Sequence, residues 1–321
     1  MLNALSGLPS FALRRIAGAA VTTLAACILV FLFLALVPGD PATIIAGDTA
    51  TEAAKAAIRT ELGLDLPLTD RLRTWLVLLA HGDLGSSLYS HAPVVTLISQ
   101  RLEPTLALAS MALVWALAIG LTTGILTAWY AEGNIDRVWM MITAAAYSMP
   151  VFFIGYLLSF ALSVRLGLFP VQGFKPVGNA PLEALHHLIL PGIAASLPIA
   201  CLLSRVTRSS FLEVLREDFV RTARAKGVRP VGLLLHHCAR NAALPIVTTI
   251  GSTLAILIEG AVFAEVVFNI PGIGSLTADA IRNRDYPVIQ GLLVVFAVVH
   301  VGVNLLVDVT YSLIDPRIAL R

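Results

Sequence analysis

The side chains best suited to binding a partner are concentrated in one charged stretch. It runs from Arg216 to Pro245 and reads REDFVRTARAKGVRPVGLLLHHCARNAALP. Apolar runs flank this charged island, so its cations must meet water, anionic lipid headgroups or another protein. Asp218 can cap a helix that starts at Phe219, and Gly227 suits the left-handed position after that helix. Pro230 suits the first turn of a second helix. A rigid lever in a partner's groove and a basic anchor for lipid headgroups both fit this pattern.

Polar side chains inside the apolar runs form a second group of candidates. Glu259 lies within the fifth run and Glu265 at its edge, whereas His300, Asn304 and Asp308 recur every four residues in the last run. Ionisable groups in a bilayer are costly and therefore candidates for function. We take Glu259, His300 and Asn304 as candidates for lining a translocation path. The alternatives are pairing of Glu259 with a neighbouring subunit, hydrogen bonding between helices for the stripe, and a structural role for Glu265 at the external interface.

Motifs for catalysis or cofactor binding do not occur in the sequence. Nothing matches the phosphate-binding loop G-x-x-x-x-G-K-[ST], H-E-x-x-H or G-x-S-x-G, and no His/Cys/Asp set has ligand spacing. Cys27, Cys201 and Cys238 are scattered, which predicts free thiols. We therefore expect a chain that is not an enzyme, with no catalytic residue, no bound cofactor and no metal.

Composition places these candidates in a membrane protein. Of the 321 residues, 57% are hydrophobic and 13% charged, against about 25% charged in soluble domains. Six apolar runs approach or exceed the length of about 20 residues that a membrane-spanning helix needs. They are residues 16–37, 106–130, 138–162, 186–204, 242–268 and 288–307. The prediction is an all-α polytopic membrane protein with six transmembrane helices, bent at Ser148-Met-Pro150 and kinked by Pro191 and Pro198 in the fourth.

Basic residues predict the orientation. The connection 205–240 carries eight basic and three acidic residues, whereas residues 38–104 carry five basic and eight acidic ones. Because cytoplasmic loops are enriched in Lys and Arg, both termini and the charged island are expected in the cytoplasm. The short connection 131–137 does not help this assignment, since it holds Glu132 and Asp136 against Arg137.

The long external segment is predicted to have structure of its own. Thr51 to Leu62 should form a short helix, with Thr51 as its N-cap and Gly63 just past its end. The apolar stretch Trp75–Ala80 is expected on the membrane surface or against the spans, followed by a turn-rich stretch from Gly82.

Several sequence motifs together resemble one family. Arg221-Thr-Ala-Arg-Ala-Lys-Gly227, followed by Arg240-Asn-Ala-Ala-Leu-Pro245, is similar to the cytoplasmic "EAA" coupling loop of bacterial ATP-binding-cassette importer permeases, and most similar to those for dipeptides, oligopeptides and nickel. The similar stretches cover nearly the whole chain: Leu36–Pro41, Glu61–Asp65, Gly82–Leu88, Leu212–Asp218, Asn283–Pro287, Asn304–Asp308 and Asp315–Ile318. The general motif's glutamate and first alanine are replaced here by Arg221 and Thr222, and the Leu-Pro pair comes later than usual.

The resemblance implies a type I importer permease fold with a cytoplasmic coupling loop at residues 205–241. Residues 1–104 would hold the N-terminal tail, first span and external segment, 105–314 the permease domain, and 315–321 a cytoplasmic tail. The implied partners are a homologous second permease, two cytosolic ATPases that bind ATP and magnesium, an extracytoplasmic substrate-binding protein and the bilayer, without nucleic acid. The implied ATPase-coupling residues are Arg221, Thr222, Ala223, Arg224, Ala225, Lys226 and Gly227.

The resemblance implies di- or oligopeptides as cargo in a bacterial inner membrane. Nickel and glutathione-type importers are alternatives within the family. From other classes, a proton-driven secondary transporter that uses Glu259 or His300, and a membrane scaffold without transport, remain to be separated.

Overall fold

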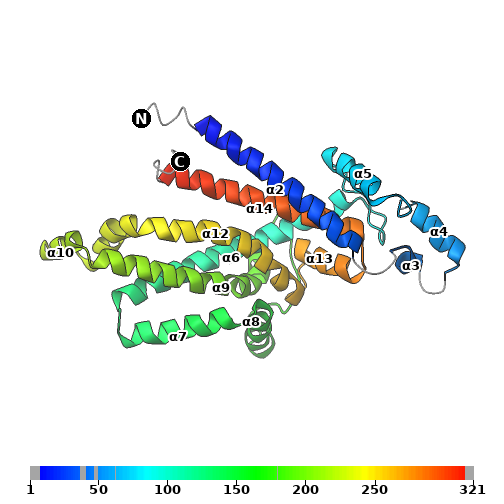
Figure 1. The fold of residues 1–321 in the computed structure, drawn as a ribbon. Coiled ribbons are helices and arrows are strands. Elements are labelled where there is room, and N and C mark those ends of the chain that lie inside the picture. Colours follow the sequence, from blue (N-terminus) through cyan, green and yellow to red (C-terminus); the bar gives the residue numbers. More distant parts are fainter. Residues whose placement is uncertain (1–7, 37–40, 47–49, 62, 179, 315–321) are drawn as a thin grey trace. The chain divides into compact units, whose positions relative to one another are not determined.

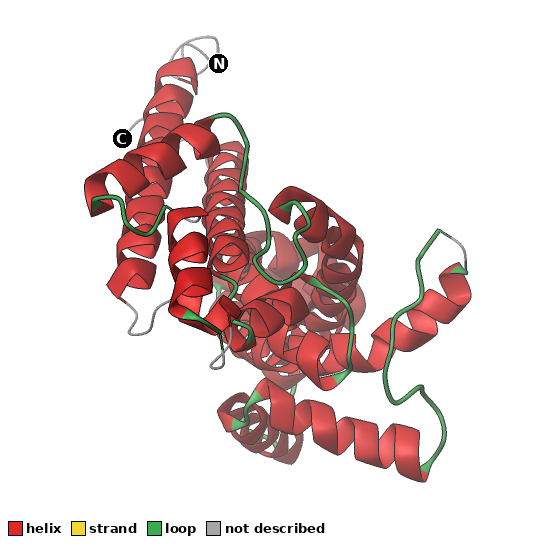
Figure 2. Cartoon of the chain, turned by 90° about the vertical axis from the view of Figure 1, so that its right-hand side faces the viewer, coloured by secondary structure: helices red, strands yellow, loops and turns green. Residues whose placement is uncertain are grey.

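The structure, a computed structural model, describes residues 8–36, 41–46, 50–61, 63–178 and 180–314 (Figure 1). Helices and loops account for this part of the chain, which contains no strand and one isolated bridge between Ser86 and Pro93 (Figure 2). In chain order the helices are α2 Leu8–Leu36, α3 Pro41–Ala46, α4 Glu52–Glu61, α5 Leu68–Ala80, α6 Val94–Trp129, α7 Asn134–Ser148, α8 Val151–Leu158, η1 Ser159–Arg165, α9 Pro181–Leu215, α10 Asp218–Ala225, α11 Pro230–Gly232, η2 Leu233–Cys238, α12 Ala239–Val267, α13 Ile273–Arg282 and α14 Tyr286–Ile314. The all-α prediction is confirmed for these residues.

In the part of the chain that the structure describes, each of the six apolar runs is mostly helical, but not all meet a strict length and hydropathy test. Among the described residues, three helices are long and apolar enough to cross a membrane: Val94–Trp129, Pro181–Leu215 and Tyr286–Leu305. The third predicted run consists of two helices, α7 and the helix that follows Pro150. The chain bends by 109° at the break between them. The bend predicted at Ser148-Met-Pro150 is therefore confirmed, and it is too sharp for a straight span. α9 continues through Pro191 and Pro198.

The chain divides into two compact units, residues 1–102 with 275–302 and residues 103–274 with 303–321. In the first unit, the Thr51 hydroxyl accepts a hydrogen bond from the Ala54 N–H (3.3 Å), as an N-cap does, and Gly63 has φ +61°. The predicted start of this helix is confirmed, and its predicted last residue, Leu62, lies outside the described residues. Trp75 packs against Phe31 of α2 with ring centroids 5.6 Å apart, so the apolar stretch contacts the first span at this point.

A hydrogen bond in the same unit joins two motifs that are far apart in the sequence. The Ser87 hydroxyl donates to the Asp285 carboxylate, and the Leu88 N–H donates to its other oxygen (3.1 Å). The backbone N–H groups of Tyr89 and Ser90 donate to the Ser87 hydroxyl oxygen at 3.2 and 2.9 Å. The two stretches Gly82–Leu88 and Asn283–Pro287 are thus joined through the Asp285 carboxylate.

The second unit is built on a close approach between α6 and α9. The α6 face that meets α9 carries a buried small residue every four positions: Ala112, Ala116, Gly120, Gly124 and Ala128. A Cβ added at Gly124 would lie 2.6 Å from the Thr207 Cβ, and one at Gly120 would lie 2.9 Å from the Leu203 Cβ. Small residues at this spacing let helix backbones approach in membranes. α12 packs along α9 in the same unit, as the ribbon also shows (Figure 1).

Replacing Gly124 by leucine is expected to destabilise this helix pair strongly. The side chain would have to displace Thr207 and the Ser204 carbonyl oxygen, which would lie 2.7 Å from the new Cβ. Overpacking of this kind costs roughly 1–3 kcal/mol or prevents folding. Thermal unfolding of the purified protein in detergent measures the effect. Gly302→Leu is the matched control, because a Cβ there has nothing within 4 Å. Equal melting temperatures for the two variants would contradict the proposed helix contact.

Candidate functional site

The candidate site is α10 and the turn that follows it, within the loop 205–241. The Val228 N–H bonds the Ala223 carbonyl (3.2 Å) and the Gly227 N–H bonds the Arg224 carbonyl (2.9 Å). Gly227 itself has φ +77°. This pair of bonds around a left-handed residue is the Schellman motif, in which glycine carries no steric penalty. The predicted turn at Gly227 is confirmed.

The start of the helix differs from the sequence prediction by one residue. The N-cap is Glu217, which makes no side-chain capping bond, and Asp218 is the first helical residue. Asp218 instead places its charge in the first turn, where it favours the helix dipole. Its ion pair with Arg221 (3.5 Å) is almost fully exposed and so adds little stability. The prediction that Asp218 caps the helix was therefore wrong.

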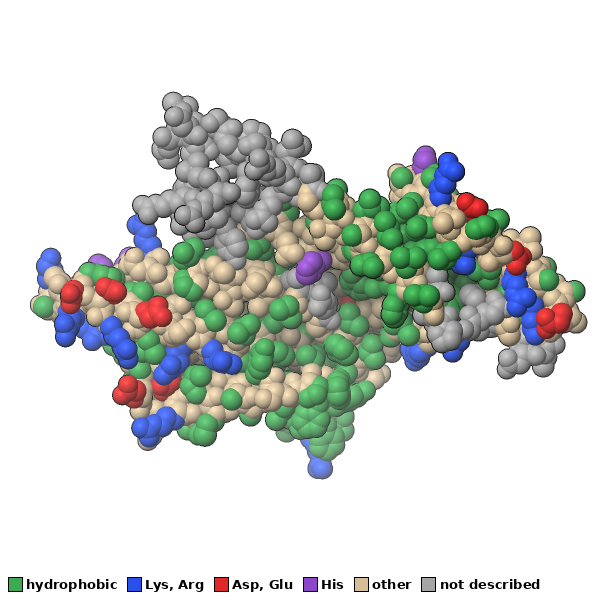
Figure 3. All heavy atoms as spheres, in the orientation of Figure 1, with side chains coloured by type: hydrophobic (Ala, Val, Ile, Leu, Met, Phe, Trp, Pro, Cys, Tyr) green, Lys and Arg blue, Asp and Glu red, His purple; other side chains and the backbone are tan. Residues whose placement is uncertain are grey.

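The two faces of α10 have different environments. Val220 and Ala223, three residues apart, are buried against the rest of the unit. The other predicted coupling residues are exposed: Arg221, Thr222, Arg224, Ala225, Lys226 and Gly227. In Figure 3 the charged side chains of this unit gather over the end that α10 forms. The short helix thus has one side fixed to the protein and one cationic side open to a partner.

The buried side of α10 belongs to the core of the membrane helices. Val220 and Ala223 share a cluster with Phe211 of α9, Leu233 of η2 and Ala242 of α12. The second helix predicted from Pro230 is confirmed, and it continues without a break through η2 into α12. Movement of α10 would therefore be transmitted to α9 and α12 through side-chain packing rather than through a flexible loop.

An ion pair holds the beginning of the loop 205–241 against α7. The Arg208 Nε and Nη2 each donate to one oxygen of Asp136, both at 2.6 Å. The Asp136 carboxylate also accepts the Glu132 N–H (2.9 Å), and its side chain is 5% exposed. Both residues lie outside the predicted spans. The hydrogen bonds from Arg208 hold the pKa of the Asp136 carboxyl below its usual value. Sequence reasoning had treated the acidic residues of 131–137 only as an exception to the charge rule.

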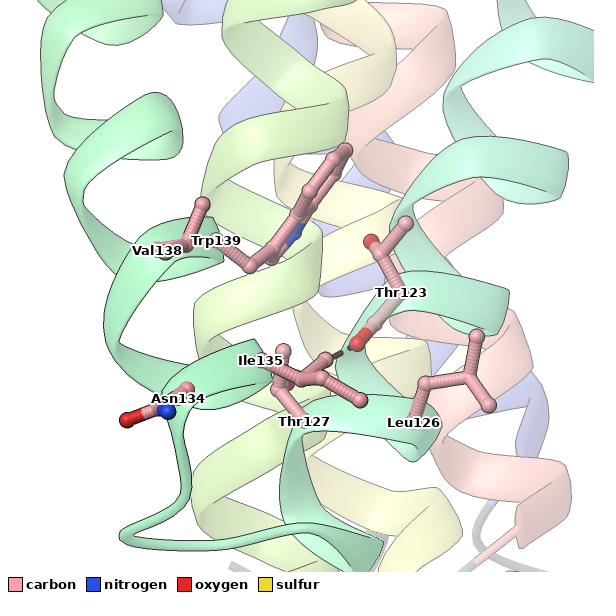
Figure 4. Close-up of a pocket in the computed structure, with 7 residues that line it drawn as sticks. All are labelled: Thr123, Leu126, Thr127, Asn134, Ile135, Val138 and Trp139. Carbon is pink, nitrogen blue, oxygen red and sulfur yellow. Dashed lines mark hydrogen bonds between the residues drawn. The ribbon is translucent and has the colours of Figure 1, made fainter.

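Three further contacts join α6, α7, α9 and α10, and Figure 4 shows two of the residues that make them, Thr123 and Trp139. The Trp139 indole N–H donates to the Ser204 hydroxyl oxygen (3.2 Å), which also accepts from the Thr123 hydroxyl (2.9 Å). Nearer the site, the Arg224 guanidinium lies over the Trp129 ring, 5.5 Å from its centroid. α6, α7 and α9 therefore support α10 as one assembly.

The predicted path residues are placed as follows. Glu259 lies in α12, but its side chain is outside the described residues. His300 and Asn304 are exposed on α14, one turn apart. The structure does not test their role in translocation. Asp308 lies in the same helix with a side chain outside the described residues.

Glu265 is a structural residue at the end of α12. It is fully buried, accepts a hydrogen bond from the Thr105 hydroxyl (2.6 Å), and its carbonyl accepts the Ile270 N–H (2.9 Å). The Thr105 oxygen in turn accepts the Ile273 N–H (2.8 Å). The left-handed Asn269, with φ +49°, completes this helix end. The structural role proposed from the sequence agrees with this geometry, although Glu265 is buried rather than at an exposed interface.

Metal-binding geometry is not found in the part of the chain that the structure describes. It contains no group of three His, Cys, Asp or Glu side chains able to hold an ion, and the three cysteines are free and buried.

Comparison with known families identifies the class of protein. Residues 120–320 match the family described as "Binding-protein-dependent transport system inner membrane component", and residues 8–109 match its N-terminal companion. The chain belongs to this family. It is thus a multi-pass inner-membrane permease of an ATP-driven importer, which decides against a proton-driven secondary transporter and against a scaffold without transport.

Relatives and solved structures agree with this assignment. The permease is 45% identical to a probable peptide ABC transporter permease of Sinorhizobium fredii, over 96% of this chain and 98% of that protein. It is 40% identical to a glutathione transport system permease of Pectobacterium atrosepticum, over 97% and 99% of the two chains. Its fold resembles the MetNI methionine ABC transporter in an inward-facing form, with TM-score 0.57 and 17% identity, over 69% of this chain and 97% of that one.

Proposed function

We propose that this permease imports di- or oligopeptides, and that the exposed face of α10 docks on a cytosolic ATPase. The observation that carries the docking proposal is the asymmetry of α10. Val220 and Ala223 fix one side to the membrane core, whereas Arg221 and Lys226 are exposed and can meet an acidic surface. A solvated anchor for lipid headgroups would not need the packed and ordered turn at Gly227.

We further propose the arrangement of the complete importer. Six spans, with both termini and the loop 205–241 in the cytoplasm, satisfy the distribution of Lys and Arg. The permease domain would occupy residues 105–314, with residues 1–104 before it and a cytoplasmic tail at 315–321, outside the described residues. A homologous second permease, two ATPase subunits that bind ATP and magnesium, and an extracytoplasmic substrate-binding protein would complete the assembly.

Peptide cargo is favoured by the relative named as a probable peptide permease, which is 45% identical. Glutathione is the second candidate, because relatives named as glutathione permeases are 40% identical over nearly the whole chain. The two cargoes share an α-amino group, a carboxylate and peptide bonds. Competition of unlabelled glutathione against labelled dipeptide uptake in vesicles separates them. Nickel stays a further alternative within the family.

The docking proposal is tested by reversing the exposed cations of α10. The double variant Arg221→Glu/Lys226→Glu should fold normally, because both side chains are exposed, and should weaken association with the ATPase subunits. Loss of two charge-assisted contacts, each worth about 1–2 kcal/mol, predicts at least a tenfold weaker association. The measurements are co-purification of the ATPases and ATP-dependent peptide uptake in vesicles.

Lys175→Glu is the control, since this exposed lysine lies on the face proposed to be external. It should leave ATPase association unchanged. Wild-type association and uptake in the double variant would show that α10 does not dock through these cations. Normal association with loss of uptake in the double variant would show that these cations act in coupling rather than in docking, whereas a wild type that imports no peptide would contradict the cargo assignment.

A further inference from the structure

The two arginines of α10 lie in different environments. Arg224 follows Val220 by four residues, so the two side chains are neighbours on one face of the helix. Val220 is buried, and so is Ala223, which immediately precedes Arg224. Arg221 lies on the other side of the helix, where its recorded partner is the exposed carboxylate of Asp218 in the same helix (3.5 Å). Arg224 is therefore the arginine of α10 that is turned toward the rest of the permease.

The Arg224 guanidinium contacts the end of α6. It lies 5.5 Å from the centroid of the ring of Trp129, which is the last residue of α6. Trp129 is half-buried and packs against the cluster that contains Val220 and Ala223. A guanidinium over an indole is a favourable cation–π pair. The ring thus gives α10 a polar contact beside its apolar one.

A second observation places the same guanidinium near η2. Cys238 is fully buried at the end of η2. Burial raises the pKa of its thiol, and the positive charge of Arg224 opposes this by lowering it. Arg224 is therefore close to both helical segments between which α10 is held, α6 and η2.

This contact can determine how α10 is turned about its own axis. The helix has only eight residues, and the burial of Val220 and Ala223 is a stabilisation without a preferred direction. A cation–π contact, in contrast, is favourable only when the cation lies over the ring face, within about 6 Å of its centroid. The Arg224–Trp129 pair therefore fixes the side to which Arg221, on the opposite part of the helix, is presented.

We propose that Arg224 is a positioning residue of the coupling loop, which holds α10 on the end of α6 through the Trp129 ring and does not itself contact the ATPase. The inference rests on the proposed docking of α10. It divides the residues expected to couple to the ATPase into two groups. Arg221 and Lys226 would meet the ATPase, whereas Arg224 would keep them turned toward it.

The test compares association with transport in the complete importer carrying Arg224→Gln or Trp129→Leu. Glutamine is a good helix former, so α10 should stay folded. Co-purification of the ATPase subunits should change by no more than about twofold, whereas peptide imported per ATP hydrolysed should fall about threefold in both variants. Trp129→Phe, which keeps an aromatic ring, should retain most of the wild-type ratio. Because both changes remove the same contact, Arg224→Gln/Trp129→Leu should be no worse than the worse single variant.

Arg221→Gln is the matched control, since it neutralises the arginine on the outer side of the same helix. It should weaken association, and its effect should add to that of Trp129→Leu. If Arg224→Gln weakens association as much as Arg221→Gln does, Arg224 contacts the ATPase and the proposal is wrong. Additive losses in Arg224→Gln/Trp129→Leu, or an unchanged ratio of peptide to ATP in the single variants, would overturn it as well. Wild-type association in Arg221→Glu/Lys226→Glu is a different result, because it would contradict the docking of α10 itself.

Discussion

Substituting alanine for Gly272 is expected to remove most of the folded permease. A Cβ at this position would overlap the carboxylate of Glu265, which is fully buried at the end of α12. The carboxylate cannot move away without losing the Thr105 hydroxyl, which donates to it at 2.6 Å. We expect a loss of roughly 2–4 kcal/mol, from overpacking together with a poorly satisfied buried charge.

The structural reason lies in the turn from Asn269 to Ile273. Its backbone folds over Glu265, and the Ile273 N–H reaches the same Thr105 oxygen that bonds the carboxylate. One buried acid thus fixes the end of α12, the turn and α6. Removing the acid leaves the Thr105 hydroxyl without its acceptor in an apolar environment, which is costly. The glycine is needed for this close approach and not for its own backbone conformation.

A double-mutant cycle separates steric overlap from general damage. Thermal unfolding of the purified protein is measured for Gly272→Ala, Glu265→Ala and the double variant. Because Glu265→Ala creates the room that the added methyl group of Gly272→Ala needs, the double variant should be clearly more stable than the sum of the single losses predicts. If the stability losses of the two single variants simply added up in the double variant, Gly272 would not be needed to accommodate Glu265. Gly260→Ala, which has nothing within 4 Å of the new Cβ, is the control and should change little.

Features that depend on neighbouring residues could be predicted from the sequence. The turn at Gly227, the N-cap at Thr51 and the bend at Pro150 each depend on the preference of a residue type for one backbone conformation. Helix ends were less accurate. α9 was expected to end near residue 204 and continues to Leu215, because apolarity marks where a helix leaves the membrane and not where its hydrogen bonding stops.

Pairings over long sequence distances could not be predicted. Asp136 meets Arg208 across 72 residues, Thr105 meets Glu265 across 160, and Ser87 meets Asp285 across 198. Each acid was visible in the sequence as an unexplained charge, but one sequence does not show which partner neutralises it. The repeated small residues of α6 are the exception. Their spacing of four was present in the sequence and marks the face that packs on α9.

Exchanging the charges of Asp136 and Arg208 is expected to distinguish two roles of this ion pair. One is thermal stability of the permease, and the other is coupling of ATP hydrolysis to peptide import. Asp136→Ala leaves the Arg208 guanidinium without its acceptor beside a nearly buried site, at a cost of about 3 kcal/mol. Arg208→Ala should cost a similar amount. Asp136→Arg/Arg208→Asp rebuilds an ion pair of opposite direction, and we expect it to recover at least half of the lost thermal stability. Melting of the purified importer measures this part.

The expected effect on coupling follows from the position of the Asp136–Arg208 pair. Arg208 is two turns from the end of α9, and α10 packs on the same helix through Phe211 and Val220. If the ATPase moves α10, the ion pair passes that movement to α7. Peptide imported per ATP hydrolysed should therefore fall several-fold in both single variants, even at temperatures where they are fully folded. A purely structural pair would change melting and leave that ratio intact.

The dependence on pH gives a final check on the same pair. Because the Arg208 guanidinium lowers the pKa of Asp136, the stabilisation is complete above the carboxyl's unfolded pKa of about 3.9 and disappears as pH falls through the folded value. Between pH 6 and 8 the stability difference between wild type and Asp136→Ala should stay constant, and it should shrink only in acid. A difference that changed near neutral pH would show that this carboxylate does not control the junction.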